Sequence, residues 1–325
     1  MTLALLFSPQ GSQHVGMGRD LAERSPAAAA VFAEADEVLG WSVTDTCWNG
    51  PADRLDDTRQ TQPCLLATSI AALRALEEVA HPTPALVAGH SVGEYAALVA
   101  AGVLDLAAGL RLVWQRAELM AGASADGEGG DGGEGGMAAV IGLDRETVQA
   151  IVDGLSRPTE LVVANDNAPG QVVISGLRDA LEAAEEPLRA EGARRILQLP
   201  VSGAFHSPLM AGVAGELATA FEAETWHEAR VPVVSNVTAE PLTDADRIRA
   251  LLAEQVRSPV EWVASVRRMV DDGVGMMIEL GPGSALSGMV RRIAPEVTTA
   301  NVSDAKSLDR AAALLASPAR VAAGS

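Results

Sequence analysis

The amino-acid sequence predicts an α/β fold in which a smaller α+β domain is inserted into a large domain with a parallel sheet. Short apolar runs alternate with helical stretches at both ends of the chain, which is typical of a parallel sheet covered on both faces. A glycine-rich segment at 125–137 separates this pattern from a different order of elements. With 325 residues, 48% of them hydrophobic, the chain is long enough for both domains.

The elements of the large domain follow from hydrophobic patterning. Three short apolar runs predict buried strands at 3–7, 84–91 and 275–284, and the last of them ends in a Gly-Pro-Gly loop. Helical patterns fill the gaps, at 25–39, 62–80, 107–123 and 215–223. The large domain is therefore expected to comprise residues 1–126 and 203–310, followed by a C-terminal tail at 311–325.

The segment 137–202 has the order strand, helix, strand, strand, helix, strand, with Pro187 as a candidate break in the second helix. This order is that of a ferredoxin-like domain, and it predicts an insertion because the α/β pattern resumes afterwards. The segment 125–137 is expected to be a flexible linker. It contains a formal G-x-G-x-x-G, but a helix precedes the motif and its acidic residues would repel a pyrophosphate, so a dinucleotide site is rejected.

Composition excludes several classes of function. The formal net charge is −19 and the pI is near 4.6, which argues against nucleic-acid and anionic-membrane partners. No stretch approaches the roughly 20 apolar residues that span a bilayer. Cys47 and Cys64 match no metal-ligand or redox spacing and are expected to be reduced thiols. With no signal-peptide pattern at its start, the chain is expected to be cytoplasmic.

The run from Gly89 to Gly93 is G-x-S-x-G, placed between a predicted strand and a predicted helix. That context predicts a nucleophile elbow, and with it an α/β-hydrolase-like large domain that presents Ser91 at a helix N-terminus. Backbone N–H groups there can hold an oxyanion. A serine also needs a base. His206, in a loop at the expected return to the large domain, is the candidate, although the pattern alone also fits a buried structural histidine; His90 is expected to pack in the interior.

Arg116 occupies an unusual place on its predicted helix. On a helical wheel it lies off the polar face, among Leu112, Leu119 and Met120. A charge in that position needs a partner. It fits either a structural ion pair or a bidentate clamp on a substrate carboxylate.

Several longer motifs together resemble the malonyl-CoA:acyl carrier protein transacylases, a pattern that polyketide acyltransferase domains share. They occur in that family's order over about residues 3–295, and they are FSPQGSQHVGMG, DTRQTQPCLLATSIAAL, GHSVGEYAAL, NDNAPGQVVISG, GAFHSPLM, LAEQVRSPVEW and IELGPGSALSGMV. One departure is visible, because Pro9 stands where the family usually has glycine. In the family, the N–H of the next residue, here Gln10, contributes to the oxyanion hole. The oxyanion hole is therefore expected to be kept despite the proline.

The resemblance implies roles for individual residues. Ser91 is the acylated nucleophile and His206 its base, oriented by a main-chain carbonyl of the Gln255 region. The N–H groups of Gln10 and Val92 form the oxyanion hole. Arg116 holds the malonyl carboxylate, and Phe205 crowds the space that a 2-methyl branch would need.

The implied reaction is a ping-pong transfer from malonyl-CoA to the phosphopantetheine thiol of an acyl carrier protein, in fatty acid or polyketide synthesis, without a bound cofactor or metal. Three alternatives remain open: a trans-acting polyketide acyltransferase with another acyl group, a serine hydrolase or thioesterase, and an interaction module without activity. The candidate docking residues for an acidic carrier are two arginine doublets, Arg194–Arg195 and Arg291–Arg292; a third, Arg267–Arg268, ranks lower.

Overall fold

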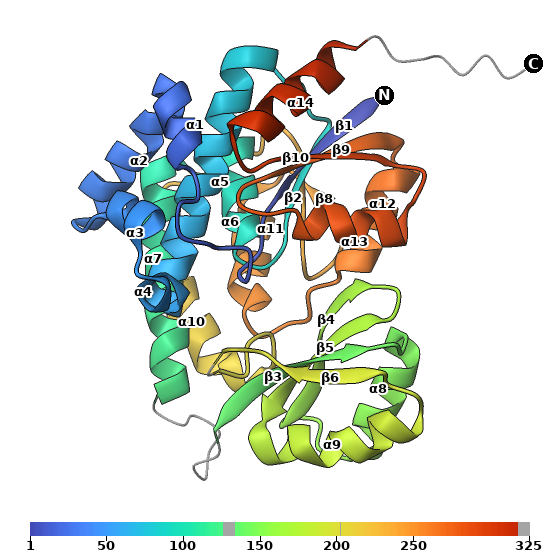
Figure 1. Cartoon of the computed structure of the whole chain (residues 1–325). Helices are drawn as coiled ribbons and strands as arrows, with labels where there is room; N and C mark the ends of the chain where they lie inside the picture. Colours follow the sequence, from blue (N-terminus) through green and yellow to red (C-terminus); the bar gives the residue numbers. More distant parts are fainter. Residues whose placement is uncertain (126–133, 202, 318–325) are drawn as a thin grey trace, which may run out of the picture.

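The computed structural model describes residues 1–125, 134–201 and 203–317, which build two sheets (Figure 1). The larger sheet has six strands in the order β10-β9-β1-β2-β7-β8. Each neighbouring pair is parallel except β7 and β8 at one edge. The strands are β1 (Thr2–Phe7), β2 (Leu86–Gly89), β7 (Val233–Val234), β8 (Pro241–Leu242), β9 (Val274–Leu280) and β10 (Thr298–Val302).

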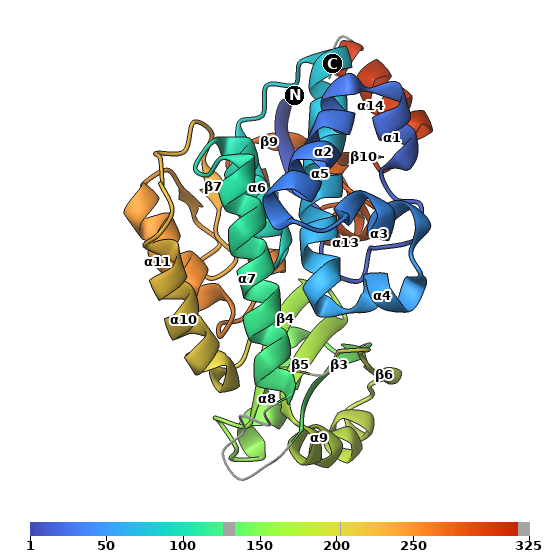
Figure 2. The ribbon, with the colours of Figure 1, turned by 90° about the vertical axis from the view of Figure 1, so that its left-hand side faces the viewer.

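Helices cover both faces of this sheet. Successive side chains of a strand point to opposite sides, so strands that are apolar throughout present two apolar faces to be buried. Leu5 and Phe7 of β1 belong to one buried cluster, whereas Ala4 and Leu6 belong to another. On the first face lie α1 (Arg19–Arg24), α2 (Pro26–Leu39), α3 (Val43–Asn49), α4 (Ala52–Asp56), α5 (Thr58–Ala80), α6 (Gly93–Ala101), α7 (Leu106–Ala125), α10 (Ala211–Phe221), α11 (Ala245–Gln255) and α14 (Ala305–Ala316) (Figure 2). On the second lie α12 (Trp262–Asp271) and α13 (Ala285–Ile293).

The smaller sheet is antiparallel, with the order β4-β5-β3-β6. Its elements are β3 (Gly135–Ile141), α8 (Arg145–Gly154), β4 (Leu161–Ala168), β5 (Gln171–Leu177), α9 (Arg178–Ala190) and β6 (Arg195–Gln198). The chain order and the sheet order are those of a ferredoxin-like unit. The predicted fold class is therefore confirmed. Pro187 does not break the second helix, which continues to Ala190.

Two boundaries differ from those expected from the sequence. β3 begins at Gly135, inside the predicted linker, because the backbone there already pairs with Leu177 of β5. The rest of that linker, 126–133, lies outside the described residues. At the other end, the tail expected from residue 311 starts with helix, since α14 runs to Ala316 and buries Ala311.

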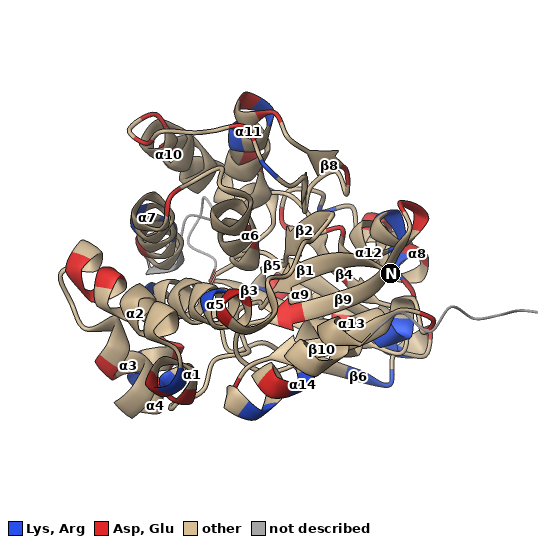
Figure 3. Ribbon diagram, turned by 90° about the horizontal axis from the view of Figure 1, so that it is seen from above, with Lys and Arg blue, Asp and Glu red and all other residues tan. Residues whose placement is uncertain are grey.

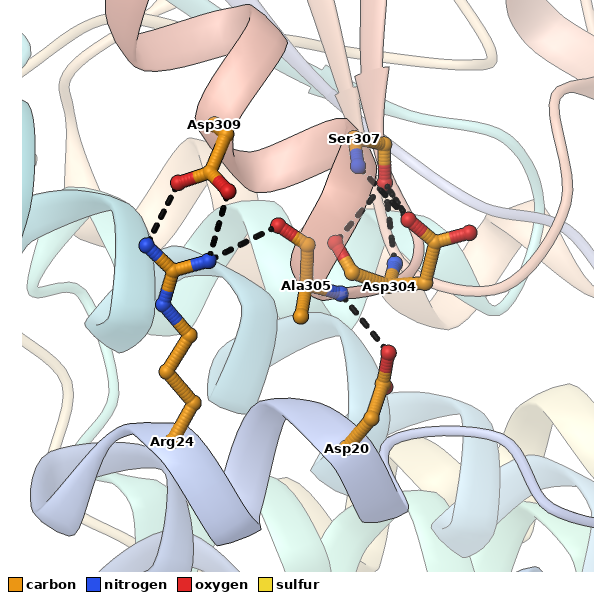
Figure 4. A network of polar contacts seen from close by, with 6 residues as sticks. All are labelled: Asp20, Arg24, Asp304, Ala305, Ser307 and Asp309. Carbon is orange, nitrogen blue, oxygen red and sulfur yellow. Dashed lines mark hydrogen bonds and ion pairs between the residues drawn. The ribbon is translucent and has the colours of Figure 1, made fainter.

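Contacts with α1 also hold α14 in place (Figure 4). Asp20 accepts a hydrogen bond from the backbone N–H of Ala305 at 2.8 Å, and Arg24 donates to both carboxylate oxygens of Asp309. Both side chains of this ion pair are exposed, so it adds little to the free energy of unfolding. The buried apolar face of α14 is therefore the main reason that the helix extends past the predicted boundary.

Across 1–125, 134–201 and 203–317, no helix has the length and apolar character needed to cross a membrane.

Candidate active site

Ser91 lies in a tight turn between β2 and α6, with a left-handed φ of 53°. The flanking glycines make this turn possible. A Cβ at Gly89 would lie 2.0 Å from the carbonyl of Gly93, and a Cβ at Gly93 would lie 2.2 Å from the oxygen of Phe7. A side chain at Gly89 would clash with the start of α6, and one at Gly93 would clash with the end of β1. The G-x-S-x-G spacing is therefore a steric requirement of this strand–turn–helix geometry.

His206 is in place to act as the base for Ser91. Its Nε2 lies 2.7 Å from the Ser91 Oγ. Its Nδ1 faces two backbone carbonyls, that of Gln255 at 2.9 Å and that of Ser258 at 3.2 Å. Because carbonyls only accept, Nδ1 carries the proton and Nε2 accepts from the serine. The orienting partner is thus main-chain oxygen, as the resemblance implied.

The surroundings of His206 keep the ring neutral. Burial, together with the positive charge of Arg116, lowers the pKa of His206 to about 3. Hydrogen bonds from Nδ1 to the carbonyls of Gln255 and Ser258 oppose that shift. At neutral pH the imidazole is therefore in the form that can accept the serine proton.

The two backbone N–H groups of the predicted oxyanion hole, those of Gln10 and Val92, have no hydrogen-bond partner among the described residues. Val92 is the N-cap of α6, and Gln10 follows β1 in the loop whose start contacts the elbow. The side chain of Gln10 is anchored on Thr58, at 3.3 Å. Pro9, buried before it, does not remove this donor.

Arg116 reaches the nucleophile from α7. Its side chain is only 1% exposed, and one terminal nitrogen lies 3.1 Å from the Ser91 Oγ. It also donates to the side-chain oxygens of Gln62, at 2.7 Å, and Gln255, at 3.2 Å. Its Nε has no partner, and no described carboxylate forms an ion pair with it. A buried cation without an anion is costly, so this geometry favours the carboxylate clamp over a structural ion pair.

The side chain of Gln255 connects Arg116 to the backbone of the turn at Ser91. Its amide oxygen accepts from Arg116, while its amide nitrogen donates to the Ser91 carbonyl and to the carboxylate of Glu94. Glu94 is buried in the first turn of α6. Burial raises the pKa of Glu94 to about 7, against the opposing hydrogen bonds and the charge of Arg116. A charge-bearing network therefore lies directly behind Ser91.

The other two predicted side chains are also buried. Phe205 directly precedes His206 and belongs to the same apolar cluster as Val92. His90 points away from the reacting atoms: its Nε2 bonds to the Asn167 side chain at 2.7 Å, and its ring packs edge-on against Trp262. His90 is thus a packing residue, as expected from the sequence.

Three residues that contact the site escaped sequence reasoning: Gln62, Glu94 and Asn236. Glu94 could have been found by the same argument as Arg116, since it is a charge inside an apolar helical run. Asn236 follows an apolar run, 231–234, and could have been placed at a strand end, where sites of parallel sheets gather. Gln62 lies within one of the quoted motifs, but the motif does not indicate its role, which depends on a tertiary contact with Arg116.

Within the described part of the chain, no group of three or more His, Cys, Asp or Glu side chains could hold a metal ion. The nucleophile elbow, the histidine on main-chain carbonyls and the buried arginine define a class: serine-dependent enzymes of acyl transfer.

Comparison with known proteins specifies the family. The model of the acyl transferase domain family matches residues 4–312. The malonyl CoA-acyl carrier protein transacylase of Bacillus subtilis is 42% identical over 310 residues, which cover 95% of this chain and 96% of that protein. This chain belongs to the malonyl CoA-acyl carrier protein transacylase family.

Solved structures of related enzymes have the same fold as this chain and match it over nearly its whole length. An acyl carrier protein S-malonyltransferase from Vibrio cholerae superposes with a TM-score of 0.90 at 39% identity, covering 96% of this chain and all of that one. A malonyl-transacylase solved in complex with its type II polyketide synthase acyl carrier protein gives 0.91 at 39% identity, covering 97% and 100%.

Proposed function

We propose that this protein transfers malonyl groups from malonyl-CoA to the phosphopantetheine thiol of an acyl carrier protein. Family membership supports the reaction, and the buried Arg116 beside the Ser91 Oγ carries the choice of acyl group. A malonyl group ends in a carboxylate that can pair with this guanidinium, whereas acetyl and simple fatty acyl groups cannot. The product would serve fatty acid or polyketide synthesis.

The reaction proceeds in two half-reactions at one site. Ser91 attacks the malonyl thioester while His206 takes its proton, and the amides of Gln10 and Val92 stabilise the oxyanion. As the tetrahedral intermediate collapses, His206 returns the proton to the leaving thiolate of coenzyme A. The carrier thiol then attacks the acyl-enzyme, with His206 again accepting the proton; as this second intermediate collapses, the ester bond to Ser91 breaks and His206 returns the proton to the Ser91 Oγ. Throughout, Arg116 holds the carboxylate.

Phe205 adds a second element of selectivity in this proposal. Because it is buried directly before the base, an added methyl at C2 of the acyl group would compete with its ring for space. Discrimination against one methyl group is modest, about 1–3 kcal/mol. Intact-mass spectrometry after incubation with a panel of acyl-CoAs tests the choice: malonyl should be retained in preference to acetyl and methylmalonyl.

A cytoplasmic location is part of the same proposal. Cys47 and Cys64 are both free thiols in the buried core, with the sulfur of Cys47 only 3.9 Å from the Cys64 carbonyl. Neighbouring thiols that stay unpaired fit a reducing compartment.

Arg116→Ala is expected to change the acyl preference. Losing a charge-assisted pair in a water-poor site costs ~1.5–3 kcal/mol or more, roughly a tenfold to a few hundredfold loss of malonyl transfer. Acetyl transfer should suffer less, so competition between malonyl-CoA and acetyl-CoA should shift toward acetyl. Arg111→Ala is the matched control, because this exposed arginine of the same helix pairs with Glu224. An unchanged preference in Arg116→Ala would make Arg116 structural.

The carrier protein is proposed to dock on four exposed arginines, which we call the arginine patch: Arg194, Arg195, Arg291 and Arg292. The two doublets come together in the fold. Arg292 donates to Gln171 and to the Pro169 carbonyl at the turn between β4 and β5, and the adjacent Gly142 packs against Arg194. In the ribbon of Figure 3, basic positions on β6 and α13 are coloured blue, and acidic positions, coloured red, occur on many other elements.

Charge supports this choice among the candidates. None of the four pairs with a described carboxylate, whereas Arg268 of the third doublet pairs with Asp272. The family resemblance implies an acidic carrier, and repulsion from the total charge of −19 is screened beyond about 8–10 Å at physiological salt. Short-range attraction to unpaired arginines can therefore decide where the carrier binds.

Charge reversal tests the arginine patch. Replacing Arg194 and Arg195, or Arg291 and Arg292, by glutamate should weaken transfer to the carrier and leave self-acylation from malonyl-CoA nearly unchanged. The same reversal at Arg267 and Arg268 serves as the control and should affect neither half-reaction. If the apparent affinity for the carrier stays the same in both patch variants, docking uses other contacts.

A further inference from the structure

Asn236 bridges two backbone groups of the turn that leads into Ser91, the Gly89 carbonyl and the Ser91 N–H, which lie on either side of His90. Its side chain is fully buried, two residues beyond β7. Its Oδ1 accepts a hydrogen bond from the Ser91 N–H at 2.6 Å, and its Nδ2 donates to the Gly89 carbonyl at 2.6 Å. Parallel pairing of Ala88 with Val234 places this asparagine directly across from the elbow.

Hydrogen-bond chemistry fixes the orientation of this amide. An N–H can only donate and a carbonyl can only accept, so the oxygen must face Ser91 and the nitrogen must face Gly89. The Ser91 N–H is therefore occupied and does not face the reacting carbonyl. The Gly93 N–H is occupied as well, by the His90 carbonyl at 3.0 Å. Of these three successive elbow amides, the one at Val92 remains for the oxyanion.

The bridge lies directly before the strained residue of the turn. Ser91 has a positive φ, which costs a non-glycine residue about 1–3 kcal/mol and persists only where the surroundings enforce it. Asn236 fixes the backbone on the N-terminal side of Ser91, while Gln255 donates to the Ser91 carbonyl on the other side. Asn236 is itself held. Its N–H donates weakly to the Glu94 carboxylate, at 3.4 Å, and its carbonyl accepts from the Glu261 N–H at 2.8 Å.

We infer that Asn236 is a positioning residue, which holds the strained elbow so that the Ser91 Oγ is aimed at His206 and the Val92 N–H at the oxyanion. The inference rests on the proposed acyl transfer through Ser91. The Ser91 Oγ attacks the thioester in the first half-reaction and bears the acyl group in the second. Loss of the bridge should therefore slow both half-reactions. It should not alter which acyl group is preferred, because the described hydrogen bonds of Arg116 go to Gln62, Ser91 and Gln255 and not to Asn236.

Asn236→Ala is the first test. The maximal rate of self-acylation should fall roughly tenfold to a hundredfold, the loss expected when a reacting group is misplaced by about 1 Å. The half-saturating malonyl-CoA concentration and the malonyl-to-acetyl ratio should change little. Asn301→Ala is the matched control, because the Asn301 side chain also donates to a backbone carbonyl, that of Gly283. The Asn301→Ala protein should be acylated at the wild-type rate. A folded Asn236→Ala protein that acylates at the wild-type rate would overturn the inference.

Asn236→Asp separates positioning from general packing. An ionised aspartate can accept from the Ser91 N–H but repels the Gly89 carbonyl, whereas a protonated one can donate to it. Burial favours the protonated form, so the rate relative to wild type should be low at about pH 8 and should recover at about pH 5.5. Two titratable groups face this position: Glu94 of α6 and, on the other side of Ser91, His206. Glu261 forms an ion pair with Arg145. Arg116 stays charged over this pH range. Comparison with wild type at each pH removes the titration that both proteins share, and the remaining pH dependence belongs to the new carboxylate as coupled to Glu94.

The outcomes are distinguishable. If Asn236→Ala does not fold, the pH profile of Asn236→Asp decides: recovery at low pH supports the inference, and a constant ratio to wild type contradicts it. If the wild-type protein itself gains no malonyl group, the proposed function fails first.

Discussion

Ser91→Ala protein incubated with malonyl-CoA is expected to gain no malonyl mass. The substitution removes the only atom that the elbow presents to the thioester, and an alanine methyl cannot form the acyl-enzyme. The turn itself should survive, because the glycines at 89 and 93 and the bridge from Asn236 to the backbone remain. Intact-mass spectrometry gives the result directly, since the expected effect is complete loss.

Ser317→Ala, at an exposed serine after α14, is the control and should be acylated like wild type. If the Ser91→Ala protein still carries a malonyl group, another side chain is the acceptor and the assignment of the nucleophile is wrong.

His206→Ala is expected to slow acyl-enzyme formation by roughly 10²–10⁴-fold, the range for loss of a positioned general base. The serine would have no acceptor for its proton within hydrogen-bond distance, since Arg116 can only donate. Rapid-quench measurement of the first turnover reports this step without the carrier.

His227→Ala is the matched control, because this histidine is exposed and lies outside the site. A His206→Ala protein that acylates at the wild-type rate would exclude His206 as the base.

The wild-type enzyme should keep its acylation rate down to about pH 5 as far as the base is concerned. The pKa of His206 in the folded protein is about 3, so the ring is protonated only below that range.

Local spacing explains which parts of the fold and site could be predicted. The elbow is a short-range steric pattern, so G-x-S-x-G between strand and helix was sufficient to place Ser91. The order of elements in the inserted unit was readable because each strand carries its own apolar run. Arg116 stood out because its position on the helical wheel conflicts with its charge.

The missing parts depend on contacts between distant segments. Gln255 was expected only as the region of the orienting carbonyl, and its side-chain bridge between Arg116 and Glu94 has no local signature. β7 and β8 are two residues long each, too short for periodicity to register. The chain boundary at 311 was misplaced because α14 continues through an alanine-rich stretch whose burial depends on its packing against the large sheet.

The two half-reactions, run in sequence on wild-type protein, test the central claim most directly. Protein incubated with malonyl-CoA and freed of excess substrate should carry one malonyl group on the peptide that contains Ser91. Addition of a carrier protein bearing phosphopantetheine should remove that group from the enzyme and place it on the carrier thiol. Failure to load Ser91, or release of the group as free malonate while the carrier stays unmodified, would contradict an acyltransferase and point to a hydrolase.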